Sequence, residues 1–180
     1  MKDISLELAK LHELTGAEFI RQLKLIVSSS EFHPVKDEQE IYSVGGEKGE
    51  DYENLLNAAR KAVGHGYWVY ILPNPKGIRT ADFILVQHGI LKMYYLKTIY
   101  GKSSVMSRLK ESVGQANHIL LNMATDYNAT ALARCIKKYY EINPNAVEVF
   151  VFKGNKSILL KRSSVENKDF LKTFIRRYNQ

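Results

Sequence analysis

Two apolar stretches joined by a short polar turn constrain the fold of this chain most strongly. They lie within residues 80–98 and meet at Gln87-His88-Gly89. Short apolar runs rich in β-branched and aromatic side chains, with a glycine turn between them, are typical of paired strands. Residues 80–98 therefore predict a β-hairpin. Asp82 opens its first strand, and Tyr95-Leu96-Lys97 lies toward the end of the second.

An acid and a lysine on paired strands are groups that metal-dependent phosphodiester cleavage uses. A carboxylate at a strand start can hold Mg²⁺, and a second carboxylate two residues before the lysine would share that strand's face. The lysine would orient a water nucleophile or stabilise the phosphate. Tyr95 occupies the position of the second carboxylate. A phenol with a pKa of about 10 stays protonated at neutral pH and is a poor Mg²⁺ ligand.

Length and charge narrow the class of protein. A chain of 180 residues with 45% hydrophobic content can bury one sizeable core. No apolar run approaches the roughly 20 residues of a membrane span, and residues 1–7 lack the apolar block of a signal peptide, so we expect a cytoplasmic protein. The formal charge of +7 favours an anionic partner. Local basic clusters, which could also be solvated helix faces, comprise Lys102, Arg108, Lys110, Lys168, Lys172, Arg176 and Arg177.

The remaining patterns predict an α/β (α+β) protein with a mixed central sheet flanked by helices. Residues 1–49 predict a helical appendage, broken near Thr15-Gly16, followed by a polar connector over 28–50. Residues 50–180 predict the main domain. Its expected elements are helices over 51–63, 103–114, 129–141 and 165–177, and strands over 67–72, 118–123, 147–152 and 157–161, besides the hairpin.

The ordered motifs of residues 50–162 resemble the PD-(D/E)XK nuclease superfamily. The likeness rests on the Gly66-Tyr-Trp-Val-Tyr strand, the Ala81-Asp82 hairpin with Tyr95-Leu-Lys97-Thr, the Gly101-Lys-Ser-Ser-Val segment and Gln115-Ala-Asn-His-Ile-Leu-Leu. Within the superfamily the chain is most similar to C-terminal tRNase toxin domains of contact-dependent inhibition proteins, and to related nuclease domains of phages and mobile elements. Residues 1–49 and the final helix lie outside the resemblance.

The resemblance implies a restriction-endonuclease-like αβββαβ core and an Mg²⁺- or Mn²⁺-dependent nuclease. It implies catalytic roles for Asp82 and Lys97, a metal-binding role for Asp82 with Glu53 as the nearest second acid, and a positioning role for Gln115. The substrate it implies is nucleic acid, RNA or DNA, with tRNA among the candidates, and an immunity protein is a further partner left open. Candidate nucleic-acid contacts are Lys102, Arg108, Lys110 and Tyr95.

Two alternatives to a nuclease stay open from the sequence. Tyr95 in place of an acid is also what a degenerate module would show, one that keeps the fold and binds nucleic acid or a protein without turnover. A structural protein of a mobile element is the third hypothesis, with residues 1–30 as its docking helix. Tyr95 itself could stack on a base or simply pack across the sheet.

Overall fold

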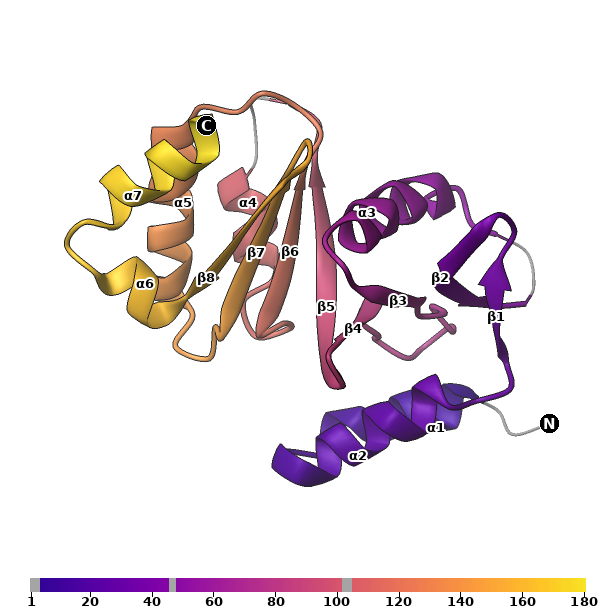
Figure 1. Ribbon diagram of the computed structural model, residues 1–180. Coiled ribbons are helices and arrows are strands. Elements are labelled where there is room, and N and C mark those ends of the chain that lie inside the picture. The colour runs from indigo at the N-terminus through magenta and orange to yellow at the C-terminus, as the bar shows by residue number, and fades with distance from the viewer. Residues whose placement is uncertain (1–3, 46–47, 102–104) are drawn as a thin grey trace. The chain divides into compact units, whose positions relative to one another are not determined.

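Strand β5, Ile90–Ile99, takes part in both of the units into which the chain divides, Met1–Tyr94 and Tyr95–Gln180. The computed structural model describes residues 4–45, 48–101 and 105–180. The first half of β5 pairs antiparallel with β4, Phe83–Gln87, and its second half pairs parallel with β6, His118–Met123. The strand order is therefore sequential from β1 to β8 (Figure 1).

The first unit is a sheet with helices on both faces. β1, Phe32–Val35, and β2, Glu38–Val44, form a hairpin, and β2 runs parallel to β3, Trp68–Ile71, which pairs antiparallel with β4. The helix α3 contacts β2 and β3, while α1 and α2 lie toward the other face (Figure 1). The helices of this unit are α1, Ile4–Lys10, the 3₁₀ turn η1, Leu11–Glu13, α2, Gly16–Val27, and α3, Tyr52–Gly64.

The hairpin formed by β1 and β2 was not predicted from the sequence, which suggested a polar connector over 28–50. His33 and Pro34 are exposed, and in β2 only Ile41 and Ser43 are buried. An apolar–polar alternation that short, with a serine at one of its two inward positions, gives little signal of a strand. β2 forms because it borders β3, whose residues Val69 and Ile71 bury the same face, and β1 then pairs with β2.

The turn between β4 and β5 confirms the predicted hairpin. His88 and Gly89 connect the strands, and their φ values are 51° and 75°. Two consecutive residues with positive φ make a type I′ turn, whose twist matches that of the flanking strands. Cross-strand partners run from Phe83 opposite Tyr94 to Gln87 opposite Ile90, so the register of the hairpin is fixed.

The second unit packs its helices on one face of the sheet that β5 forms with β6, β7 and β8 (Figure 1). β6 runs parallel to β7, Glu148–Lys153, which forms a hairpin with β8, Lys156–Lys161. The helices are α4, Val105–Glu111, α5, Ala129–Ile142, α6, Arg162–Glu166, and α7, Phe170–Asn179. Their shared core includes Ile99, Leu109, Ile119, Leu121, Leu132, Ile136, Val149, Val151, Phe174 and Tyr178.

The single basic helix predicted over 165–177 is divided into α6 and α7. Asn167 has an extended backbone, with φ −64° and ψ 136°, and its side-chain oxygen accepts a hydrogen bond of 2.9 Å from the Asp169 amide. Asn and Asp side chains compete with the helix for backbone amides in this way. The break turns α7 so that Phe170, Phe174 and Tyr178 enter the core.

The order of elements confirms the predicted fold class. From α3 to β6 the chain reads α-β-β-β-α-β, with β4 antiparallel to both β3 and β5, and β6 parallel to β5. The mixed sheet carries helices, as an α+β protein requires. Within the described residues, no helix combines the length and the apolar character needed to cross a membrane.

Buried tyrosines in the second unit are expected to make its stability fall at alkaline pH. Burial raises the pKa of Tyr178 to about 12 and also raises the pKa of Tyr139. The unfolded chain therefore loses these protons first, so the stabilisation is complete below about pH 10 and falls as the pH rises toward 12. We expect a loss of about 2–3 kcal/mol from Tyr178 over that range.

Chemical denaturation followed between about pH 9 and pH 12 measures this dependence. Tyr178→Phe lacks the ionisable hydroxyl, so its stability is expected to fall less steeply above pH 10 than that of the unchanged protein. An equally steep fall in both proteins would show that Tyr178 is not the titrating group.

Candidate nucleic-acid interface

Asp82 lies where the sequence placed it, at the start of β4. Its amide donates to the Tyr94 carbonyl oxygen over 3.1 Å, and its own carbonyl oxygen accepts from the Leu72 amide over 2.9 Å. These bonds extend the β3–β4–β5 ladder by one residue and fix the backbone of Asp82. Its side chain is half-buried.

Tyr95 and Lys97 lie in the second unit, on the part of β5 that pairs with β6. Tyr95 is the register partner of Ile119, and Lys97 is the partner of Leu121. Tyr95 packs against the hydrophobic core of that unit, and both side chains are half-buried. A phenol packed in this way contributes to the core, as the packing interpretation of Tyr95 predicted.

Glu53 and Asp82 do not come together in the first unit. Ser43, Ile71 and Phe83 are successive cross-strand partners, and the Tyr52 hydroxyl lies 3.5 Å from the Ser43 hydroxyl, so α3 covers the face that carries them. Because side chains alternate along a strand, Asp82 points to the opposite face from Phe83. Glu53, in the first turn of α3, is exposed.

The surroundings of Glu53 are those of a surface ion-pair cluster. Arg60, also exposed on α3, donates from Nε to Glu38 Oε1 over 2.6 Å. That hydrogen bond raises the pKa of Arg60, and the negative charge of Glu53 adds to the effect. Glu53 therefore lies near an arginine and a second acid, and these contacts are those of a solvated surface charge.

Gln115 was expected on a helix behind the site, and it lies in the turn that follows α4. Its amide donates to the Ser112 carbonyl oxygen over 3.0 Å, and its side chain is exposed. Gly114, with φ 75°, lies in the same turn. Lys102, predicted to contact nucleic acid, lies outside the described residues.

The sequence motif implies a divalent metal, which needs at least two carboxylate ligands close together. Across residues 4–45, 48–101 and 105–180, no group of three or more His, Cys, Asp or Glu side chains is arranged to hold a metal ion. Tyr95 is half-buried against the core of the second unit, and Glu53 is exposed in the first turn of α3, the helix that covers the face of Phe83. The residues present do not fit the two-carboxylate site.

Net charge divides unevenly between the two units. The first unit, residues 1–94, contains 11 Lys and Arg against 13 Asp and Glu, a formal charge of −2. The second, residues 95–180, contains 15 Lys and Arg against 6 Asp and Glu, a formal charge of +9. The excess positive charge of the chain therefore belongs to the second unit.

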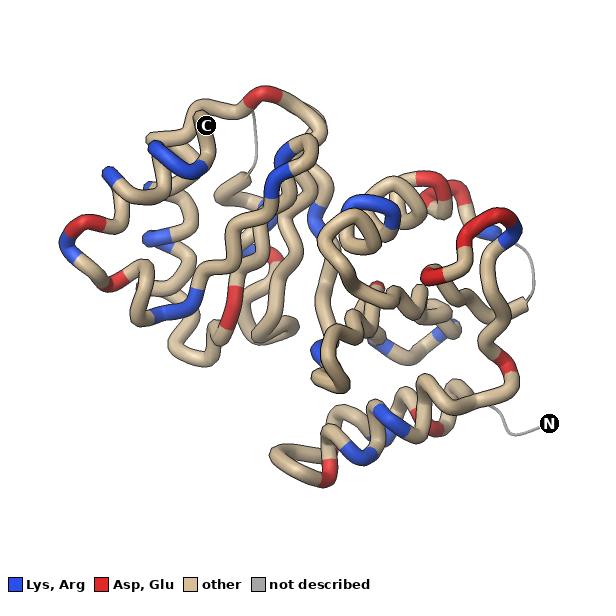
Figure 2. Tube along the Cα trace, in the orientation of Figure 1, with Lys and Arg blue, Asp and Glu red and all other residues tan. Residues whose placement is uncertain are grey.

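Two neighbouring helices expose much of this charge. α5 and α7 pack against each other, and Lys and Arg positions, coloured blue in Figure 2, lie along both helices. The exposed cations of these helices are Arg134, Lys137 and Lys138 on α5, and Lys172, Arg176 and Arg177 on α7. Lys138 forms an ion pair of 3.1 Å with Glu141, whereas the other five have no ion-pair partner among the described residues. We call them the α5–α7 basic surface.

The cations on α4 are also exposed. Arg108 and Lys110, both predicted nucleic-acid contacts, lie in its last turn. Arg108 is 4.0 Å from Glu111, at the limit of an ion pair, and an exposed pair of this kind contributes little energy. Both residues are available to an anionic partner.

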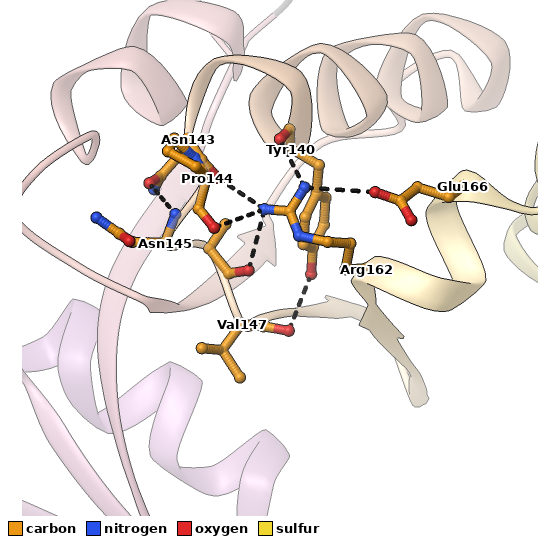
Figure 3. Close-up of polar contacts among 8 residues, drawn as sticks. Tyr140, Asn143, Pro144, Asn145, Val147, Arg162 and Glu166 are labelled. Atoms are coloured by element: carbon orange, nitrogen blue, oxygen red, sulfur yellow. Dashed lines mark hydrogen bonds and ion pairs between the residues drawn. The ribbon is translucent and has the colours of Figure 1, made fainter. Parts of the chain in front are cut away.

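Arg162 has a structural role instead (Figure 3). Its Nη1 donates to the Tyr140 carbonyl oxygen over 2.9 Å, and Nη2 donates to the carbonyl oxygens of Asn143 over 2.8 Å and Pro144 over 3.2 Å. These carbonyls lie at the C-terminal end of α5, which lacks intrahelical donors and carries negative partial charge. The guanidinium also lies over the Tyr140 ring, 5.1 Å from its centroid. Arg162 therefore caps α5 and is not a free cation.

Sequence reasoning found the C-terminal basic cluster but not the cations of α5. Lys172, Arg176 and Arg177 stand out because they are close together near the end of the chain, whereas Arg134, Lys137 and Lys138 lie among apolar residues of a helical pattern. Counting charge separately in the two halves of the chain would have revealed the concentration.

Comparisons with known proteins give one structural likeness. No protein-family profile matches the chain, and no curated protein sequence matches it. Among solved structures, it is similar to a chain of the CdiA-CT/CdiI toxin and immunity complex from Burkholderia pseudomallei, with 17% sequence identity and a TM-score of 0.43. The alignment covers 66% of this chain and 92% of that chain.

Proposed function

We propose that this protein binds nucleic acid through its second unit. The observation that carries the proposal is the formal charge of +9 on residues 95–180, with six exposed cations on the packed helices α5 and α7. Lysine and arginine side chains that neutralise phosphates release condensed counterions, which gives binding its strength and its salt dependence. Contacts with phosphates carry no direct sequence information. We therefore expect this surface to bind the nucleic-acid backbone without preference for a particular base sequence.

Incubation with tRNA, single-stranded DNA and duplex DNA tests this function and the nuclease hypothesis together. Each substrate is offered with Mg²⁺, with Mn²⁺ and with EDTA, and both the bound fraction and the length of the recovered nucleic acid are measured. The proposal predicts binding in all three conditions, with the nucleic acid recovered intact. No binding at low salt would contradict it.

A metal-dependent nuclease is the second candidate function, with RNA, and tRNA in particular, as its substrate class. What favours it is the α-β-β-β-α-β order together with Asp82, whose backbone is hydrogen-bonded to β5 just before the Tyr95-Leu96-Lys97 triplet. In the superfamily that the motifs resemble, Asp82 would be the metal-binding acid, and Lys97 would stabilise charge on the phosphate. The poor fit of Glu53 and Tyr95 to a metal site counts against it.

Substitutions at two positions separate the candidates. If cleavage is found, Asp82→Asn is expected to abolish it and to leave binding intact, because the amide cannot replace the carboxylate charge. Tyr95→Phe, which keeps the ring in the core, is the control for folding. Unchanged cleavage in Asp82→Asn would remove Asp82 from the reaction.

A toxin role with an immunity partner remains a proposal from the sequence resemblance. An acidic protein covering the α5–α7 basic surface would block nucleic acid by competing for the same charges. Competition between a candidate immunity protein and labelled single-stranded RNA would test it, with simultaneous binding of both as the contrary result.

A further inference from the structure

Three aromatic rings form a parallel stack on the first unit. The Tyr42 ring stacks with two rings of β3, with its centroid 5.0 Å from that of Tyr70 and 5.9 Å from that of Trp68. The interplanar angles are 14° and 16°, so the three ring planes are nearly parallel. Phe32 meets Tyr70 edge-on, with centroids 5.2 Å apart. We call Tyr42, Tyr70 and Trp68 the aromatic stack.

The stack reaches solvent at Trp68. Trp68 and Tyr70 share one face of β3, whereas Val69 and Ile71 are buried on the other face. The side chain of Trp68 is 47% exposed, although this residue begins a strand between two hydrogen-bonded neighbours. A large ring held in a fixed plane and left open to water offers a ready surface for a second planar group.

A pocket of about 450 Å³ adjoins the exposed ring. This volume lies within the range of roughly 300–1,000 Å³ that small-ligand pockets occupy. Trp68, Tyr70 and Val86 form its apolar side, and Gly66, Gln87 and the His88-Gly89 turn complete the lining. Among the residues that the structure describes, no lysine, arginine, aspartate or glutamate lines it, so these residues offer no charged group of fixed sign to a ligand.

The Gln87 side chain, which lines the pocket, is held in place by a hydrogen bond. Gln87 Nε2 donates to the His65 carbonyl oxygen over 3.0 Å, which leaves the carboxamide oxygen as an acceptor for a ligand. Gly66, with φ 83°, permits this arrangement, because a Cβ there would lie 3.2 Å from Gln87 Nε2. A fixed amide beside an open ring matches a planar group that carries hydrogen-bond donors on its edge.

We infer that the pocket binds a nucleobase of single-stranded nucleic acid, stacked on Trp68. This inference rests on the proposed nucleic-acid binding and adds a base-recognition site to it. A nucleobase has the planar faces that the stack extends and edge donors that the Gln87 oxygen accepts, and each stacked base contributes about 1–3 kcal/mol. Because none of the pocket's described lining residues is a lysine, arginine, aspartate or glutamate, we expect this contact to depend less on salt than phosphate binding by the second unit.

Trp68 reports on the pocket directly, since it is the single tryptophan of the chain. The full chain is titrated with a short single-stranded oligonucleotide and with an abasic oligonucleotide of equal length and charge, while tryptophan emission is recorded. Stacking of a base predicts quenching by the first and none by the second. Equal quenching by both, or unchanged emission when the oligonucleotide is bound, would overturn the inference.

An independent readout uses a labelled oligonucleotide and fluorescence anisotropy. Trp68→Leu is expected to weaken binding about tenfold, consistent with the loss of one stacked base. Tyr100→Leu, which removes an exposed tyrosine outside the stack, is the matched control. Unchanged affinity in Trp68→Leu would contradict the pocket and leave the proposed function standing. Absence of any oligonucleotide binding would overturn both, and quenching by oligosaccharides alone would assign the pocket to sugars.

Discussion

Replacing Lys172, Arg176 and Arg177 with glutamine is expected to weaken binding to single-stranded nucleic acid by a factor on the order of 10 to 100 at low salt. All three residues lie on the exposed side of α7 and have no ion-pair partner among the described residues. Each phosphate contact on a single strand adds about 0.7 to the slope of log affinity against log salt. The triple variant should therefore lower that slope by about 2.

A charge-matched variant controls for the overall change of net charge. Arg21, Lys24 and Lys36 are exposed in the first unit, and their replacement by glutamine removes the same three charges. Because these residues lie in the unit with a formal charge of −2, we expect only a small loss of affinity. Equal losses in the two variants would show that net charge, not the α5–α7 basic surface, governs binding.

Arg162→Ala is expected to destabilise the protein by about 2–3 kcal/mol, since it removes charge-assisted hydrogen bonds from the end of α5. The guanidinium donates to carbonyl oxygens of Tyr140, Asn143 and Pro144, and its side chain is 34% exposed, so part of its energy is screened by water. For a chain of this size the expected fall in the thermal midpoint is roughly 5–10 °C.

Two substitutions distinguish the cap from a simple ion pair. Arg162→Lys keeps the charge but cannot span several carbonyls, so it should recover only part of the lost stability. Glu166→Gln breaks the ion pair of 3.6 Å between Glu166 and Arg162, and an effect below about 0.5 kcal/mol is expected because Glu166 is exposed. If Glu166→Gln were as destabilising as Arg162→Ala, the ion pair and not the cap would carry the energy.

Much of the fold could be predicted because local signals agree with one another. The His88-Gly89 turn lies between two clearly apolar strands, and His65-Gly66 follows a helix whose alanines are buried. The hairpin of β1 and β2 could not be predicted, since its inward positions are few and one is Ser43. The break at Asn167 depends on a side-chain hydrogen bond that competes with the helix, which periodicity does not reveal.

The candidate site shows where motif spacing stops being informative. Spacing placed Asp82 at a strand start correctly, but it could not show that Glu53 faces solvent on α3 or that Gln115 follows its helix. The first outcome depends on which side of α3 is buried, and the second depends on where α4 ends. The aromatic stack was missed for a similar reason, because Tyr42 lies in the unpredicted strand β2 and meets Trp68 only after that strand pairs with β3.

The salt dependence of nucleic-acid binding by the unchanged protein tests the central proposal most directly. Affinity for a short labelled single-stranded RNA is measured by anisotropy across a series of salt concentrations, with EDTA present throughout. Contacts from the six cations of the α5–α7 basic surface predict a linear fall of log affinity against log salt, with a slope of about −2 to −4. A slope near zero, or no binding at low salt, would contradict binding through the charge of the second unit.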